Sequence, residues 1–315
     1  STLKLSHLHQ IISSENTKKY DKLIFNPEVQ LRYKLNYRSW LDFSIGQETE
    51  LVEEKNLFEN YIQNSNRTFS RNNTSLKPII PLKSRLQYSF NDQFSSFMFN
   101  TIMSMEKRSH NFIPSTVFDG VNSFVTYNFS ESNSEYFTLS TSASKYLGFI
   151  KSNLKIRLSS NLFNFQNKVN NSDIRDNRSV YNNLNLILKT GFLKKFNFEN
   201  NFQIGKNQFQ NDIFRVSNQS WSNSFSTYYT DSKFKFSVSL DYVEPSNANI
   251  DEIFFIDAFT RYSNKKGTIN YSLSWNNTNF SNSLIQEKFI NDISETITET
   301  KLQDSYIMFK MQLKL

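Results

Sequence analysis

The sequence alternates between apolar and polar residues over long stretches, and this alternation restricts the fold more than any other feature. In residues 28–36, Val29, Leu31, Tyr33 and Leu35 take the odd positions, while polar or charged residues take the even ones. A β-strand places successive side chains on opposite faces, so a period of two describes a strand whose faces meet different surroundings. A helix would need apolar residues at every third or fourth position.

The same alternation recurs along the chain. It is clearest in residues 82–91, 151–162, 233–242 and 306–315. Weaker versions occupy residues 40–45, 97–105, 137–143, 184–188, 196–204, 221–229, 254–262 and 269–275, and another strand is expected near residues 3–12. The sequence therefore predicts an all-β protein of about fourteen strands.

Composition supports this fold class. The chain holds 31 Phe and 15 Tyr but only three Ala, a balance that favours strands over helices. No stretch approaches the ~18 consecutive apolar residues of a membrane-spanning helix. The absence of Cys excludes a disulfide scaffold and a thiolate site.

Connections between the predicted strands alternate between short and long. The long ones cover residues 52–81, 107–135, 167–178 and 281–300. Tight turns at one rim and long loops at the other are typical of a transmembrane antiparallel up-and-down β-barrel in the bacterial outer membrane. Residues 1–315 are thus expected to form one barrel domain with extracellular long loops, and an extra extracellular hairpin at 115–128 stays an open alternative. A soluble sandwich is disfavoured, because its strands average about 5–6 residues, and a solenoid because no fixed repeat appears.

In such a barrel the apolar face meets lipid and lipopolysaccharide, and Trp40, Trp221 and Trp275 are expected in the interfacial girdles. The chain has a formal net charge of +7, and many of its basic residues fall on the polar face of the predicted strands. The candidate lumen-facing basic residues are Arg32, Lys34, Lys83, Arg85, Lys155, Arg157, Lys233 and Lys235. They form either a solvated wall that pairs with plug carboxylates or a basic lumen that favours anionic solutes. Nucleic acid is not an expected partner, since the aromatic residues lie on the opposite face from the charges.

Several segments resemble the barrel of TonB-dependent outer-membrane receptors. They are FNPEVQLRYKLNYRSWLDFSI at 25–45, LQYSFNDQFSSF at 86–97, FTLSTSASKYLGFIKSNLKIRL at 137–158, IDAFTRY at 256–262, YSLSWNNTNF at 271–280 and the final SYIMFKMQLKL. The resemblance implies a 22-stranded barrel, a plug domain and a partner, TonB. Since this sequence shows about fourteen strands and neither a plug nor a TonB box, it looks like the C-terminal part of such a barrel.

The resemblance implies ligand uptake across the outer membrane. Two alternatives remain open: a non-transporting scaffold that binds a surface lipoprotein or other subunits of an outer-membrane complex, and an autonomous pore of about fourteen strands. Pairing of residues 3–12 with residues 306–315 would close the barrel within this chain and exclude the larger parent.

No motif indicates catalysis, so we expect that the protein is not an enzyme and that it binds no cofactor and no metal ion. His7 and His9 share one face of a predicted strand, but no Cys or dense carboxylate group accompanies them. Two acidic clusters are interpreted as solvated loops rather than calcium sites; they consist of Glu48, Glu50, Glu53 and Glu54, and of Asp292, Glu295 and Glu299.

Overall fold

The computed structural model describes residues 2–12, 18–50, 60–72, 77–170, 172–191, 195–244, 252–264, 269–279, 284–290, 295–301 and 304–313, and side chains within 24–276 and 304–313 of these. Strands dominate them, with one 3₁₀ turn at Gly148–Ile150. No helix among these residues is long and apolar enough to cross a membrane.

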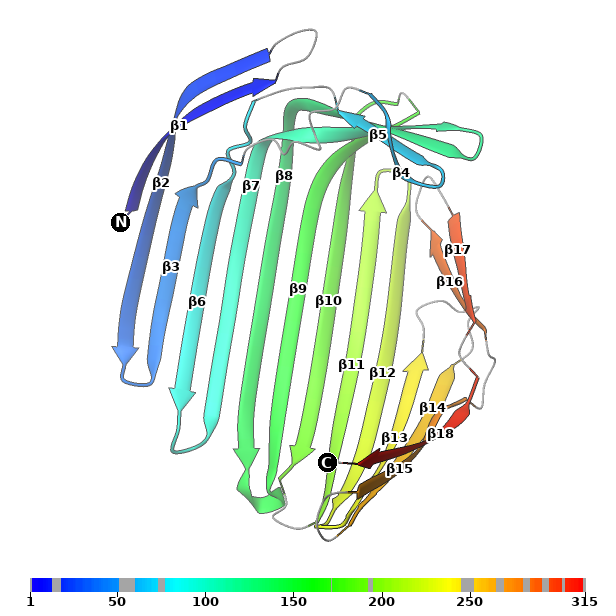
Figure 1. Ribbon diagram of the computed structural model, residues 1–315. Coiled ribbons are helices and arrows are strands. Elements are labelled where there is room, and N and C mark those ends of the chain that lie inside the picture. Colours follow the sequence, from blue (N-terminus) through cyan, green and yellow to red (C-terminus); the bar gives the residue numbers. More distant parts are fainter. Residues whose placement is uncertain are drawn as a thin grey trace.

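Fourteen strands follow one another, each paired with its neighbour in the chain's order, in one antiparallel up-and-down sheet (Figure 1). They are β1 (Thr2–Ile12), β2 (Lys18–Asn36), β3 (Ser39–Gln47), β6 (Leu82–Asp92), β7 (Phe97–Asp119), β8 (Asn122–Leu147), β9 (Ser152–Val169), β10 (Arg175–Thr190), β11 (Phe196–Asn211), β12 (Arg215–Thr230), β13 (Phe234–Glu244), β14 (Ile253–Ser263), β15 (Ile269–Asn279) and β18 (Tyr306–Leu313). The predicted fold class and strand number are confirmed.

The predicted long loops contain more strand than expected. Residues 52–81 include the hairpin of β4 (Ile62–Ser65) and β5 (Thr68–Asn72), and residues 281–300 include most of β16 (Leu284–Ile290) and β17 (Glu295–Lys301). Residues 107–135 are mostly the outer parts of β7 and β8, and β9 and β10 extend into 167–178. Because Ser115 pairs with Thr126, the hairpin at 115–128 is present.

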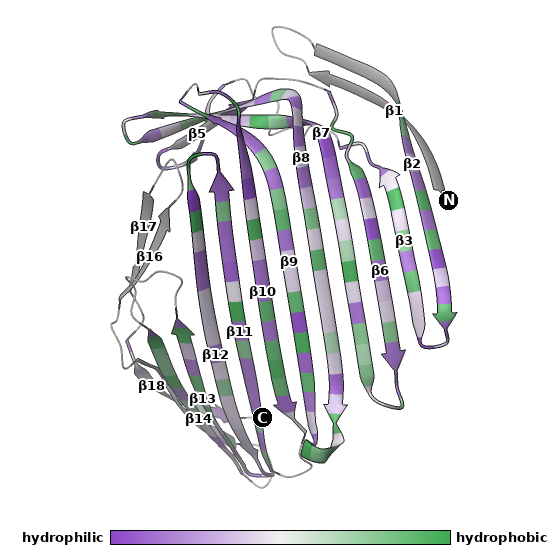
Figure 2. Cartoon of the chain, turned by 180° about the vertical axis from the view of Figure 1, so that it is seen from behind, coloured by the Kyte–Doolittle hydropathy of each residue, from purple (hydrophilic) through white to green (hydrophobic). Residues whose placement is uncertain are grey.

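The two faces of the sheet differ as the alternation predicts, and polar and apolar residues alternate along the strands in Figure 2. One row of cross-strand neighbours on the apolar face runs from β2 to β12 and is mostly aromatic or aliphatic; it consists of Tyr33, Leu41, Tyr88, Thr101, Thr141, Leu158, Leu184, Ile204 and Trp221. The girdle prediction is wrong for Trp40. It pairs with Lys34 and Ser89 on the polar face, because its neighbour Leu41 already points to the apolar one.

The sheet encloses almost no apolar core of its own. Among the described side chains, the buried apolar ones are those of Ile24, Ile79, Ile113, Ile253 and Pro81. The apolar face is instead open, with Leu31 61% exposed, Leu158 40% and Phe309 65%. Proteins in water rarely present so extended an apolar surface, so this face requires lipid or another cover.

The hairpins are staggered in a regular way. The row described above continues from Trp221 to Glu244 and crosses each later hairpin further from its short turn. The distance from the first residue of a strand to its residue on the row grows by two at every second strand. It is 2 residues for Leu41 in β3, 4 for Thr101 in β7, 6 for Leu158 in β9, 8 for Ile204 in β11 and 10 for Glu244 in β13. Each hairpin adds two strands, so the stagger is one residue per strand. With strands about 4.8 Å apart and a rise of about 3.3 Å per residue, the strands tilt by about 35° from the barrel axis, as in closed barrels.

The sheet is open. β1 and β18 stand at opposite ends of the strand order, and no ladder joins them within the described residues. The chain therefore does not close a barrel by itself in this structure.

Candidate functional site

The polar face carries the cavities in which a solute could be held. One of about 580 Å³ lies between β2, β3, β6 and β7, and a second of about 600 Å³ adjoins it through Ser44 and Arg85. A third of about 520 Å³ lies between β8, β9, β10 and β11. All three are lined mainly by polar-face side chains, so this face is the candidate functional site.

Seven of the eight predicted basic residues lie on this face. Their cross-strand neighbours place Arg32, Lys34, Lys83, Arg85, Lys155, Arg157 and Lys235 there, whereas Lys233 lies in the turn before β13. The structure does not gather them into one site. They are spread from β2 to β13, and their partners differ.

The polar face of β2, β3, β6 and β7, here called the charged sector, pairs three of its cations with carboxylates of the same chain, namely Arg32, Lys83 and Arg108. Lys34 and Arg85 have no ion pair with a described residue, and Arg85 donates a hydrogen bond to Gln87. Arg32 Nε is 2.5 Å from Asp42 Oδ1 on the neighbouring strand. Lys83 Nζ lies 2.8 Å from Glu48 Oε2 and 3.0 Å from Glu50 Oε1. Pairing with plug carboxylates is one of the two predictions for these cations. In the structure the carboxylates come from this chain: Asp42 lies in β3, and Glu48 and Glu50 lie in the segment that follows it.

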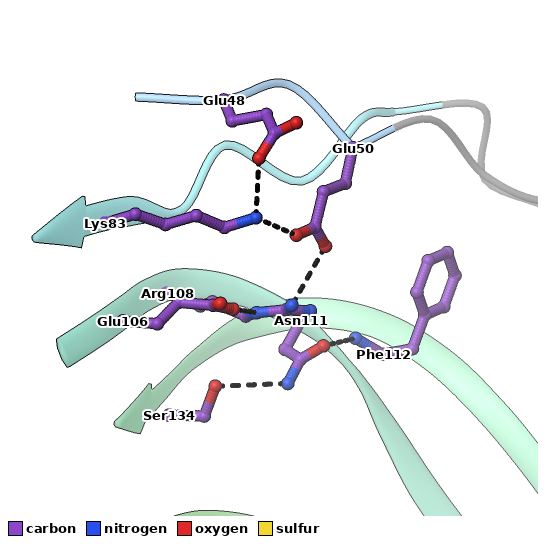
Figure 3. A network of polar contacts seen from close by, with 8 residues as sticks. All are labelled: Glu48, Glu50, Lys83, Glu106, Arg108, Asn111, Phe112 and Ser134. Carbon is purple, nitrogen blue, oxygen red and sulfur yellow. Dashed lines mark hydrogen bonds and ion pairs between the residues drawn. The ribbon is translucent and has the colours of Figure 1, made fainter. Parts of the chain in front are cut away.

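Glu50 extends this network to a bend in the β7–β8 hairpin (Figure 3). Its second carboxylate oxygen is 2.9 Å from Arg108 Nη2, and Arg108 Nε is 2.5 Å from Glu106 Oε1. Arg108 stands at a β-bulge, where Ser132 and Asn133 oppose the single residue Ser109. A bulge of this kind bends its strands.

Beyond the bulge the hairpin turns across the upper ends of the neighbouring strands (Figure 1). Ser115 and Thr116 of β7 pair with Lys168 and Val169 at the top of β9. On the other edge, β5 pairs in parallel with residues 123–127 of β8. The hairpin is thus fastened at three places, and the Glu50 network is the one at its base.

The polar face of β8, β9, β10 and β11 around the third cavity, here called the amide sector, is nearly neutral. Its hydroxyl and amide groups come from Ser140, Ser142, Ser159, Asn183, Asn185, Asn201 and Gln203. Arg157 lies among them, with Ser142 and Asn185 as its cross-strand neighbours. Among the described residues lining this cavity none is acidic, and Arg157 has no hydrogen bond or ion pair with any described residue.

Amide groups of the sector also have unused hydrogen-bonding capacity. Asn185 donates from Nδ2 to Asn201 Oδ1 at 2.6 Å, yet its own Oδ1 has no partner. The Oδ1 atom of Asn183 likewise lacks a partner. Buried polar groups in folded proteins are usually hydrogen-bonded to other protein groups or to ordered water.

Sequence reasoning missed both the Glu50 network and the asparagines. The sequence predicts that the first acidic cluster is a solvated loop. Glu48 is 67% exposed, whereas Glu50 is only 31% exposed and contacts both Lys83 and Arg108. Glu53, Glu54 and Asp292 lie outside the described residues, as do the side chains of Glu295, Glu299, His7 and His9. The asparagines did carry a signal, since their parity in β10 matches that of the other polar-face residues.

Comparisons with known proteins give only distant likenesses. No protein-family model matches the sequence, and a search of curated proteins gives no match. Among solved structures, the FpvAI–pyocin S2 complex is 8% identical with a TM-score of 0.49; the match covers 98% of this chain and 53% of the other, so this chain spans about half its length. The toluene transporter TodX of Pseudomonas putida is 9% identical with a TM-score of 0.27, over 91% of this chain and 83% of the other. The register and side chains of this chain therefore remain the basis for its function.

Proposed function

We propose that the chain forms part of the wall of a bacterial outer-membrane β-barrel through which a polar solute passes. The observation that carries this proposal is the stagger of one residue per strand in a sheet with one exposed apolar face. That stagger is the geometry of a tilted barrel wall, and lipid is the natural cover for the apolar face. The polar face then lines the lumen, and the protein acts as a transporter rather than an enzyme.

The finer proposal is ligand uptake in the manner of TonB-dependent receptors. The open sheet supports it, because the two edges leave room for the remaining strands of a barrel of about 22. A plug domain and TonB would be supplied from outside the described residues. Under this proposal the bent β7–β8 hairpin lies on the extracellular side, where ligand enters.

A scaffold within a larger outer-membrane complex is the second candidate. The β4–β5 hairpin favours it, because it docks on β8 through the rings of Tyr61, Phe69 and Phe124 and builds a rigid surface above the wall. A surface lipoprotein or another subunit could bind such a platform.

Uptake by intact cells separates these proposals. We expect the native protein in the outer-membrane fraction, with an electrophoretic mobility that changes on heating, as folded barrels show. Energised uptake of a polar solute should stop when a protonophore is added, whereas flux through a passive pore should continue. A deletion strain with unchanged uptake of every solute tried would contradict transport and leave the scaffold.

A further inference from the structure

We propose that Arg157 and the amide sector form a binding subsite for an anionic, hydroxyl-rich solute, with sugar acids as the simplest class. This inference rests on the proposed function, since it names the chemistry of the solute that the lumen receives. Three observations carry it: an uncompensated cation, an excess of uncharged hydrogen-bonding groups and a cavity of suitable size.

The first observation is the charge of Arg157. Its exposed side chain has no acidic partner among the described residues, unlike Arg32, Lys83 and Arg108 in the charged sector. Lys155 lies two residues earlier on the same face of β9, between Ser144 and Ile187, and it also has no ion pair with a described residue. A guanidinium group presents paired donors that fit a carboxylate or a phosphate, and its charge-assisted hydrogen bonds are stronger than neutral ones.

The second observation is the chemistry around that charge. Serine hydroxyls donate and accept hydrogen bonds, and asparagine side chains offer both kinds of group. Ser142 and Asn185 flank Arg157, and the same cavity is lined by further hydroxyl and amide side chains, those of Ser140, Ser159, Asn183, Asn201 and Gln203. Solute hydroxyls supply donors and acceptors at close spacing, so a polyhydroxylated molecule matches this wall better than an apolar anion does.

The third observation is the space available. The cavity of about 520 Å³ is within the ~300–1,000 Å³ of small-molecule sites. It is open on the polar face and shares none of its lining residues with the cavities of the charged sector. The subsite is therefore separate from the Glu50 network.

Calorimetry on the full native protein in detergent, with four probes, tests the proposal. Galacturonate and galactose 6-phosphate carry the anion as carboxylate or phosphate, galactose has the hydroxyls without charge, and acetate has the charge without the hydroxyls. We expect one or both sugar anions to bind about tenfold more tightly than galactose, and acetate to bind weakly, because the charge-assisted bonds add to the hydroxyl contacts. The tighter of the two sugar anions identifies the anionic group.

Arg157→Gln should reduce this preference to nearly onefold. The matched control is Lys206→Gln, which removes the same charge from β11, two strands away, but lies on the opposite face, beside Asn182 and Gln219. Both variants should retain the heat-dependent mobility of the wild type, which shows that the barrel is folded. Equal binding of galactose and galacturonate, or unchanged preference in Arg157→Gln, would overturn the proposal.

Failure of this inference can be told apart from failure of the proposed function. Uptake of solutes without preference for sugar anions, and without an effect of Arg157→Gln, leaves transport intact and removes the subsite. Preferential binding in a protein that transports nothing leaves the subsite and removes transport.

Discussion

The charged sector and the amide sector lie side by side on one face of one sheet, but among the described residues only the charged sector has ion pairs between residues that line its cavities. In the charged sector Arg32, Lys83 and Arg108 each meet a carboxylate of the same chain within 3 Å. In the amide sector Arg157 meets only hydroxyl and amide groups among the described residues. Ion pairs within the chain help to fix the conformation of the wall, whereas a cation without a partner can form its ion pair with a solute.

The comparison depends on both sectors facing water, and the largest expected effect tests this. Leu158 is next to Arg157 but points to the apolar face, in the row with Thr141 and Leu184. Leu158→Lys should destabilise the inserted barrel by about 2–4 kcal/mol if this position is near the middle of the membrane. The measurement is the amount of folded protein in the outer-membrane fraction.

Ser159→Lys is the matched control, because it puts the same charge one residue further on, facing the lumen. It should accumulate nearly as the wild type does. Equal losses in the two variants would show that the two faces are not lipid and water.

The next effect concerns the charged sector alone. Glu50→Gln removes one carboxylate from Lys83 and from Arg108 at once, although each keeps a second one. Since these side chains are half-buried, we expect the base of the bent hairpin to lose about 1–2 kcal/mol. The measurement is the rate of proteolysis near the bulge at Ser109 and Ser132.

Glu131→Gln serves as its control on the same hairpin. Glu131 is 91% exposed, and its only ion-pair contact among the described residues is with His110 Nε2 at 3.9 Å, so its loss should leave proteolysis unchanged. Equal proteolysis of wild type and Glu50→Gln would mean that the pairings with β5 and β9 hold the hairpin without the network.

A substitution can also turn one sector into the other. Asn185→Asp places a carboxylate beside Arg157, as Asp42 stands beside Arg32. We expect the stability to change by less than about 1 kcal/mol, as for cross-strand ion pairs, while the preference for galacturonate over galactose falls from about tenfold to nearly none. Calorimetry measures both affinities. Asn185→Ser, which adds no charge, should keep the preference, and a variant Asn185→Asp that keeps it would contradict the role of Arg157.

How far the sequence leads can be judged from these same residues. Alternation alone assigns Arg157 and Leu158 to opposite faces, since the period of two is a local property. The pairing of Arg32 with Asp42 depends on register, and the contact of Glu50 with Arg108 depends on how a long connection folds back. Neither contact is encoded in the local pattern, so the sequence predicts the cations of the charged sector but not their partners within the chain. The stagger that indicates a tilted barrel wall is likewise a property of register, across the nine strands from β3 to β13.

The smallest expected effect is that of substituting a carboxylate at the rim of short turns. Here the two sectors are alike, because each has an aspartate whose pKa is lowered. In the turns around the amide sector, Lys195 Nζ is 2.8 Å from Asp231 Oδ1, and this hydrogen bond is the main cause that lowers the pKa of Asp231 from its usual 3.8. Beneath the charged sector, the pKa of Asp92 is lowered chiefly by the hydroxyl of Ser95, with a further contribution from Arg38.

A lowered pKa means that the native state binds the proton more weakly than the unfolded chain does. Each carboxylate therefore stabilises the fold above its usual pKa of 3.8, and this contribution is lost as the pH falls through the lowered native value. The raised pKa of Lys195 has the opposite sign, so its contribution is complete below 10.5 and is lost at higher pH. Asp231→Asn and Asp92→Asn should each lower the unfolding temperature at pH 7 by about 1–2 °C, and the difference from wild type should vanish at low pH. A pH dependence in only one of the two would show that the sectors differ at their rim as well as on their wall.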